Sequence, residues 1–344
     1  MQIKTDVPAI DLHRCTNDIS GFIANGGPAM TGQKAIRPQK TPLRQRLWRD
    51  RYLYLLLLPV LVYYVLFKYV PFYGIQMAFK DFDSNMTAGV LASEWKGFYY
   101  FKRLFSSIVF FRVFKNTIIL NIMRLAFGFP APIFLALMLN EVHSMAYKRI
   151  SQSIMYIPHF FSWVVLGGIV SSVLSPSTGI VNVLYKAVSG SEEGIYFLMD
   201  EKLWRPVYVA VNIWKEVGWG TIIFLAAISG VDVELYEAAI IDGANKAQQI
   251  WHITLPGIRP TIVILLILRM GAMMDVGMES VLVLENPVVR SVSDVFSTYI
   301  YRQGVGSAQY SLTTAMGLFQ SVISCMLLLT TNAVSNRLTG DGIW

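Results

Sequence analysis

Residues 53–72 read LYLLLLPVLVYYVLFKYVPF, a run of twenty residues in which Lys68 is the only charged side chain. A helix of about 20 apolar residues is long enough to cross the roughly 30 Å hydrocarbon core of a bilayer. Five further runs satisfy this length with few polar interruptions, at about 114–139, 153–174, 205–229, 258–284 and 309–334. The sequence therefore predicts an all-α membrane protein with six transmembrane helices over residues 51–337.

Basic residues gather just before the first apolar run. The chain has 344 residues, 15% of them charged and 54% hydrophobic, with a net charge of +7. Seven of the basic residues form this cluster: Lys34, Arg37, Lys40, Arg44, Arg46, Arg49 and Arg51. Such clusters stay on the cytoplasmic side of a membrane, so we expect residues 1–50 to be a flexible cytoplasmic leader. No basic module interleaved with aromatic residues follows, which argues against a nucleic-acid partner.

An even number of spans places both termini on the cytoplasmic side. The inner loops are then residues 140–152 and 230–257, and Lys148 and Arg149 in the first of them agree with this orientation. The outer loops are residues 73–113, 175–204 and 285–308.

The chain contains no pattern typical of an enzyme or of a nucleotide site. Cys15 and Cys325 lie too far apart for a disulfide framework, and the four histidines have no metal-ligand spacing. Residues 27–34 imitate a phosphate-binding loop, but Lys34 is displaced by one position and no Ser or Thr follows it. We therefore expect a non-catalytic chain that binds no metal or cofactor itself, with its energy source on a separate subunit.

The inner loop between the fourth and fifth spans contains residues 237–256, EAAIIDGANKAQQIWHITLP. Asp232 is a suitable N-cap for a helix over residues 233–244, and Gly243 permits a sharp turn. A second helix is expected over residues 247–253, with Pro256 ending it. A slim helix pair of this kind suits a groove on a soluble partner, although an ordinary amphipathic loop helix is the alternative reading.

This stretch resembles the EAA motif of ABC importer permeases, which is Glu-Ala-Ala, three residues, Gly, nine residues, Ile, one residue, Leu-Pro. The sequence matches it at Glu237, Ala238, Ala239, Gly243, Ile253, Leu255 and Pro256. The resemblance implies the type I importer permease fold. It also implies that the loop over residues 232–256 docks into a cleft on the ATP-binding subunit.

Other residues resemble the carbohydrate permeases of the maltose and polysaccharide type. The similar segments are Asn116-Thr117, Tyr156 to Phe160, Leu174 to Pro176, Trp214 to Trp219, Asn286-Pro287 and Gly317 to Ser321, so that the likeness covers about residues 45–337. It implies a permease in the bacterial inner membrane that translocates an oligosaccharide, of which an acidic one such as an oligouronide is one form. The family pattern has Gly at the position of Glu216, so this acid is a departure.

The resemblance also implies the partners. They are a second, related permease, two ATP-binding subunits that bind ATP and Mg²⁺, and an extracytoplasmic solute-binding protein. Transport would proceed by alternating access. An ion-coupled secondary carrier is the alternative; it would need no EAA motif and would transport without ATP.

Charged and aromatic residues within the spans are candidates for the substrate path, because charges in a membrane are costly and often functional. The candidates are Trp163, Asn212, Trp214, Lys215, Glu216, Trp219, Asp275, Glu279 and Gln320. Asp275 and Glu279 are four residues apart and would share one helix face. The same residues, with Arg269, could instead form buried ion pairs that fix helix packing. On either reading the charged groups should face the bundle interior.

Overall fold

The structure is a computed structural model that describes residues 48–83 and 86–343. The regular elements among its described residues are all helices, and the only β interaction there is an isolated antiparallel bridge between Lys80 and Trp95. The chain divides into two units, residues 1–67 and 68–344. The predicted leader lies almost entirely outside the described residues, as do Cys15 and the residues 27–34.

The described part of the first unit is the helix α3 (Arg51–Tyr64), which runs into the π-helical turn η1 (Val65–Tyr69). Every side chain of α3 is exposed, although twelve of its fourteen residues are Leu, Tyr or Val. A helix that is apolar on all sides suits surroundings that are themselves apolar.

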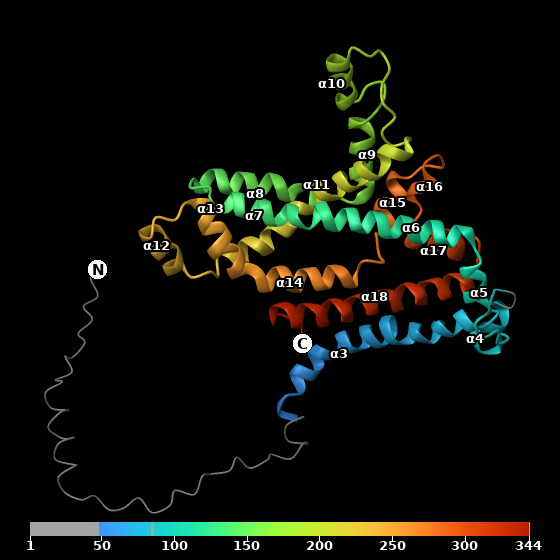
Figure 1. Ribbon diagram of the computed structural model, residues 1–344. Coiled ribbons are helices and arrows are strands. Elements are labelled where there is room, and N and C mark those ends of the chain that lie inside the picture. The colour runs from blue at the N-terminus through green and yellow to red at the C-terminus, as the bar shows by residue number, and fades with distance from the viewer. Residues whose placement is uncertain (1–47, 84–85, 344) are drawn as a thin grey trace, which may run out of the picture. The chain divides into compact units, whose positions relative to one another are not determined.

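The second unit contains the remaining described helices. In chain order they are η2 (Val70–Phe79), η3 (Met86–Ala88), α4 (Gly89–Ala92), α5 (Tyr99–Phe105), α6 (Ile108–Met123), η4 (Arg124–Gly128), α7 (Pro130–Asn140), α8 (Met145–Phe160), α9 (Trp163–Val173), α10 (Ile180–Ser189), α11 (Glu201–Ile228), α12 (Val233–Ile241), α13 (Lys246–Gln249), η5 (Ile250–Thr254), α14 (Leu255–Gly271), α15 (Met278–Leu284), α16 (Arg290–Ser293), α17 (Phe296–Tyr301), η6 (Arg302–Gly306) and α18 (Tyr310–Thr339). Figure 1 shows α12 and α13 at one end of this unit and α5 and α17 at the other.

Five continuous helical segments are long and apolar enough to cross a membrane. They are Arg51–Phe79, Ile108–Asn140, Glu201–Ile228, Lys246–Gly271 and Tyr310–Thr339, and the bent pair α8–α9 makes a sixth if it counts as one span. The predicted all-helical fold with its six spans is confirmed in this form.

The third predicted span is not one helix but two. The axes of α8 and α9 meet at 106°, and the chain between them is Phe161 and Ser162. The Ser162 hydroxyl accepts a hydrogen bond from the backbone N–H of Val165 at 3.3 Å and so begins α9 as its N-cap. Hydropathy gave no sign of this break, because the residues on both sides are apolar.

The fifth predicted span is also shorter than expected, because α14 ends at Gly271. Residues 272–277 form a turn in which Gly277 has φ +92°, and a separate short helix, α15, follows. Asp275 lies in this turn and accepts a hydrogen bond from the N–H of Gly277. The prediction that Asp275 and Glu279 share a helix face within the bundle is therefore wrong, and both residues are exposed.

Helix α11 forms the centre of the second unit. It packs against α7, α8, η4 and α14, and Gly218 and Gly220 allow the closest of these approaches. A Cβ at Gly218 would lie 2.2 Å from the carbonyl oxygen of Met155 in α8, and one at Gly220 would lie 2.8 Å from Pro132 in α7. Small residues allow the same close packing in membrane helices generally. They bring α7 and α8 up to α11, where the candidate site lies.

Candidate functional site

The loop between α11 and α14 has the helix-turn-helix form that its sequence predicts. Asp232 caps α12 by accepting a hydrogen bond from the N–H of Glu234 at 3.0 Å. The chain reverses at Gly243, whose φ of +79° is a conformation that residues with a Cβ rarely adopt. Asn245 then begins α13 with a capping box that it shares with Gln248.

Helix α12 presents an apolar surface to solvent. Each of its side chains is exposed or half-buried, including Val233, Leu235, Ile240 and Ile241, the last of which is 86% exposed. Ala238 and Ala239 of the motif keep the helix slim. A cluster of large apolar side chains that stays exposed on a short helix is typical of a surface that a partner covers.

Three contacts attach α12 and its turn to the membrane helices. The Tyr236 hydroxyl lies 2.9 Å from that of Thr254, and the side-chain amide of Gln249 donates to the carbonyl oxygen of Ala244 at 3.1 Å. Lys246 forms an ion pair of 3.2 Å with Glu141, just after the end of α7. A movement of α12 would therefore displace α7 as well as α11 and α14, the helices on either side of the loop.

Pro256 does not end the second helix, so that prediction is wrong. The chain passes from α13 through the π-helical turn η5 directly into α14. Pro256 lies in the first turn of α14, where its missing N–H costs no hydrogen bond. Ile253 and Leu255 are half-buried, and Leu255 packs against the cluster around Phe224 and Ile258. The motif thus ends inside a helical segment that extends from Lys246 to Gly271.

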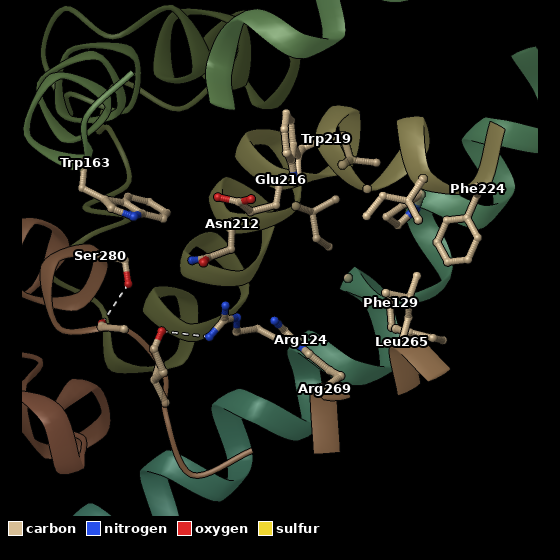
Figure 2. Close-up of a pocket in the computed structure, with 18 residues that line it drawn as sticks. Arg124, Phe129, Trp163, Asn212, Glu216, Trp219, Phe224, Leu265, Arg269 and Ser280 are labelled. Carbon is tan, nitrogen blue, oxygen red and sulfur yellow. Dashed lines mark hydrogen bonds between the residues drawn. The ribbon is translucent and has the colours of Figure 1, made fainter. Parts of the chain in front are cut away.

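A pocket of about 360 Å³ lies beside α11. Its walls come from η4, α7, α9, α11, α14, the turn before α15 and the first turn of α15. Its polar side chains are Arg124, Asn212, Glu216, Arg269 and Ser280, and its aromatic ones are Phe129, Trp163, Trp219 and Phe224. Figure 2 shows Arg124 and Arg269, from two different helices, lying close together below Asn212 and Glu216.

Of the charged side chains in this pocket, Arg124 and Glu216 have hydrogen-bond partners and Arg269 has none within the described residues. Arg124 donates to the carbonyl oxygen of Val276 at 2.8 Å, whereas Arg269 forms no hydrogen bond or ion pair within residues 48–83 and 86–343. The Glu216 carboxylate lies 3.1 Å from Nδ1 of His159, and the His159 ring stacks on Trp219 with a centroid separation of 4.7 Å. Two guanidinium groups therefore share the pocket with one carboxylate that already has a partner.

Four of the nine predicted substrate-path residues line the pocket, namely Trp163, Asn212, Glu216 and Trp219. Lys215 is buried against the end of α8, Gln320 donates to the carbonyl oxygen of Met274 at 3.0 Å, and Trp214, Asp275 and Glu279 are exposed outside the pocket.

The predicted ion pairs of Lys215 and Arg269 with these acids do not form within the described part of the chain. Lys215 contacts carbonyl oxygens instead.

The two arginines of the pocket were not among the nine predicted substrate-path residues. Arg124 lies in the second predicted span and Arg269 in the fifth, and the signal for both is a charge within an apolar run. Sequence alone does not say that they meet, because 144 residues separate them.

Residues 128–339 match the family described as binding-protein-dependent transport system inner membrane component. The chain belongs to this family. The permease is thus the membrane subunit of an ABC importer and is not itself catalytic. Nothing in the comparisons supports the ion-coupled secondary carrier.

The relatives of the permease include transporters of saccharides. It is 46% identical to the protein LplB of Bacillus subtilis over 86% of this chain and 92% of the relative. It is 42% identical to YteP of the same organism, a polygalacturonan/rhamnogalacturonan transport system permease, over 92% and 98% of the two chains.

Among solved structures, the permease resembles a chain of a bacterial ABC transporter that imports the acidic polysaccharide alginate. The TM-score is 0.79 and the identity 43%, over 86% of this chain and 99% of the other. A second structure of a bacterial alginate transporter, in complex with a periplasmic protein that holds an alginate pentasaccharide, gives a TM-score of 0.80 at 42% identity over 88% and 99% of the two chains.

Proposed function

We propose that this permease translocates an acidic oligosaccharide, and that the pocket beside α11 is its part of the substrate path. The observation that carries the proposal is the pair Arg124 and Arg269 in a pocket walled by Trp163 and Trp219. A guanidinium group binds a carboxylate through two parallel hydrogen bonds. An aromatic face offers apolar contact to the C–H surface of a sugar ring. The two together fit a uronate residue.

The balance of charge supports the same substrate class. The charged side chains that line the pocket are Glu216, Arg124 and Arg269, so one positive charge is in excess there, and within the described residues it is Arg269 that forms no hydrogen bond. A neutral sugar would give this arginine only hydroxyl acceptors, which form weaker hydrogen bonds than a carboxylate does. The relatives named for polygalacturonan/rhamnogalacturonan and for alginate carry acidic saccharides, in agreement with this inference.

The coupling part of the proposal concerns the loop over residues 232–256. Its motif residues, Glu237, Ala238, Ala239, Gly243, Ile253, Leu255 and Pro256, would meet an ATP-binding subunit. The exposed apolar surface of α12 supports this role. A second permease, two ATP-binding subunits carrying ATP and Mg²⁺, and a solute-binding protein would complete the transporter, with both termini of this chain on the cytoplasmic side.

The test of the substrate class compares two substrates in the purified transporter reconstituted in proteoliposomes. Uptake of an oligogalacturonate is measured beside uptake of the same oligomer with its carboxylates methyl-esterified, for the wild type and for Arg269→Gln. We expect the substitution to lower uptake of the acidic oligomer by about tenfold or more, the effect of losing a hydrogen bond to a charged group. Uptake of the ester should change little.

Arg259→Gln is the matched control, because Arg259 lies on the same helix but is exposed and pairs with Asp341 outside the pocket. It should transport both oligomers as the wild type does. Equal losses for the acidic oligomer and its ester in Arg269→Gln would contradict the proposed substrate class.

A further inference from the structure

The break between α8 and α9 leaves carbonyl oxygens without their usual helical partners. The last turn of α8 ends at Phe160, and Phe161 and Ser162 lie outside both helices. The last four carbonyl groups of any helix lack an intrahelical donor, and in a membrane no water replaces it. A bend of 106° inside an apolar span therefore needs donors from elsewhere in the fold.

Lys215 of α11 supplies these donors. Its ammonium group donates to the carbonyl oxygens of His159 at 2.8 Å and Phe161 at 2.7 Å, with Pro158 further away at 3.5 Å. It also lies 5.4 Å from the ring centroid of Trp163, the first residue of α9. The residue is 6% exposed. One buried cation thus contacts the last turn of α8, the break and the first turn of α9.

Glu216, the next residue of α11, contacts the side chain of His159 at the same corner. The Glu216 carboxylate lies 3.1 Å from Nδ1 of His159, whose backbone carbonyl Lys215 binds, and the His159 ring also stacks on Trp219. Two consecutive residues of α11 therefore hold the main chain and the side chain of one corner residue. On the other side of the corner, Trp163 forms part of the pocket wall.

Helix α11 also connects this corner to α12. It runs without interruption from Glu201 to Ile228, and only residues 229–232 separate it from α12. Gly218, three residues after Lys215, allows α8 to lie against α11. A displacement of α12 that moves α11 along its axis would therefore be passed through Lys215 to the corner and to Trp163.

We propose that Lys215 is a positioning residue for transport, which ties the corner of the broken span to α11 so that the pocket wall at Trp163 moves together with the loop over residues 232–256. This inference rests on the proposed coupling role of that loop. It adds the part of the chain through which the movement reaches the pocket. A lysine that only satisfied carbonyl groups would be needed for assembly but not for the ratio of transport to ATP hydrolysis.

The experiment uses the complete transporter in proteoliposomes, with its binding protein and an oligogalacturonate. Lys215→Met removes the ammonium group at similar length, and Lys215→Arg keeps the charge and the donors. We expect the number of sugars imported per ATP hydrolysed to fall by about tenfold or more in Lys215→Met, with the ATP-binding subunits still copurifying. Lys215→Arg should restore most of this ratio.

A distance measurement separates this inference from the proposed function. Spin labels are placed at Val164 in α9 and Ala210 in α11, which are both exposed, after Cys15 and Cys325 are replaced by Ser. In the wild type the distance between the labels should stay the same with and without trapped nucleotide. In Lys215→Met it should change or broaden, and this readout does not depend on which sugar is carried.

An unchanged transport ratio together with an unchanged label distance in an assembled Lys215→Met transporter would overturn the proposal. Should that variant fail to assemble, Lys215→Gln takes its place, because its amide can satisfy one carbonyl oxygen for assembly but is neutral and one bond shorter, so that it cannot hold His159 and Phe161 together as the ammonium group does. The same two measurements then decide in the same way.

Discussion

The contact between α8 and α11 can be tested at Gly218. A Cβ there would lie 2.2 Å from the backbone carbonyl oxygen of Met155. Such contacts are essentially never shorter than 3.0 Å, so Gly218→Ala would push the helices about 0.8 Å apart. The obstacle is backbone and cannot rotate away, and overpacking of this kind costs about 1–3 kcal/mol.

Replacing Gly by Ala also has a favourable side, because Ala is better in a helix by roughly 1 kcal/mol. Gly317 in α18 measures this term alone, since a Cβ there meets nothing within 4 Å. The difference between Gly218→Ala and Gly317→Ala therefore isolates the steric cost of about 1–3 kcal/mol.

The assay is thermal unfolding of the purified transporter, followed by tryptophan fluorescence. A cost of this size corresponds to a midpoint about 1–4 °C lower, because a chain of 344 residues at roughly 2.1 cal/mol/K per residue shifts by about 1.4 °C per kcal/mol. Gly218→Ala should unfold at a clearly lower temperature than Gly317→Ala. If the two midpoints coincide, α8 and α11 do not pack at the distance described, and the argument for the corner loses its geometric basis.

Three further predictions concern other parts of the chain. Gly243→Ala forces a residue with a Cβ into φ +79°, at a cost of about 1–2 kcal/mol, and should reduce copurification of the ATP-binding subunits. Burial raises the pKa of Glu285 despite the nearby Arg302. The folded state therefore binds a proton at Glu285 more tightly than the unfolded state does, whose pKa there is 4.5. The protein should become more stable as the pH falls from above the folded-state pKa toward 4.5. Thermal unfolding midpoints measured across this pH range would show the rise. A cysteine at Asp341 should resist an impermeant thiol reagent added outside intact cells.

Each of these has its own control. Gly306→Ala adds a Cβ in open space without a positive φ, so it should leave copurification unchanged; an equal loss would remove the link to the turn at Gly243. Glu285→Gln should flatten the pH dependence of the unfolding midpoint, and an unaltered slope would assign it to another group, with the neighbouring Asp294 as the first to examine. Labelling of the cysteine at position 341 from outside would reverse the proposed orientation.

The parts of the fold that depend on neighbouring residues could be predicted from the sequence. The apolar runs predicted the spans, and Asp232 and Gly243 predicted the start of α12 and its turn, because N-caps and positive φ values are local requirements. The prediction that Pro256 ends a helix was wrong because the effect of a proline depends on which side of it the helix lies. A proline ends a helix that precedes it but is also well suited to begin one, and the π-helical turn before it is not apparent in the sequence.

The parts of the site that depend on distant residues could not be predicted in this way. Lys215 was expected to pair with an acid, since charges in a membrane usually do. The carbonyl groups that it binds become available only through the break at Phe161, which hydropathy does not reveal. Likewise, Arg124 and Arg269 each stood out as a charge in a span, but only the packing of η4 and α14 beside α11 brings them together.

The π-helical turn η5 gives the spacing of the motif a rotational meaning. Such a turn holds one residue more than the α-helix would in the same place, and one residue corresponds to about 100° about a helix axis. Deleting one residue between Ile250 and Thr254 would therefore return this turn to α-helical spacing and leave the direction of α13 and α12 relative to α14 nearly unchanged, whereas deleting one residue from the regular helix α14 would rotate them by about 100°. The nine residues between Gly243 and Ile253 thus lead into a turn that holds one residue more than α-helical spacing needs, so a one-residue deletion in η5 should keep the direction in which α12 leaves the membrane helices.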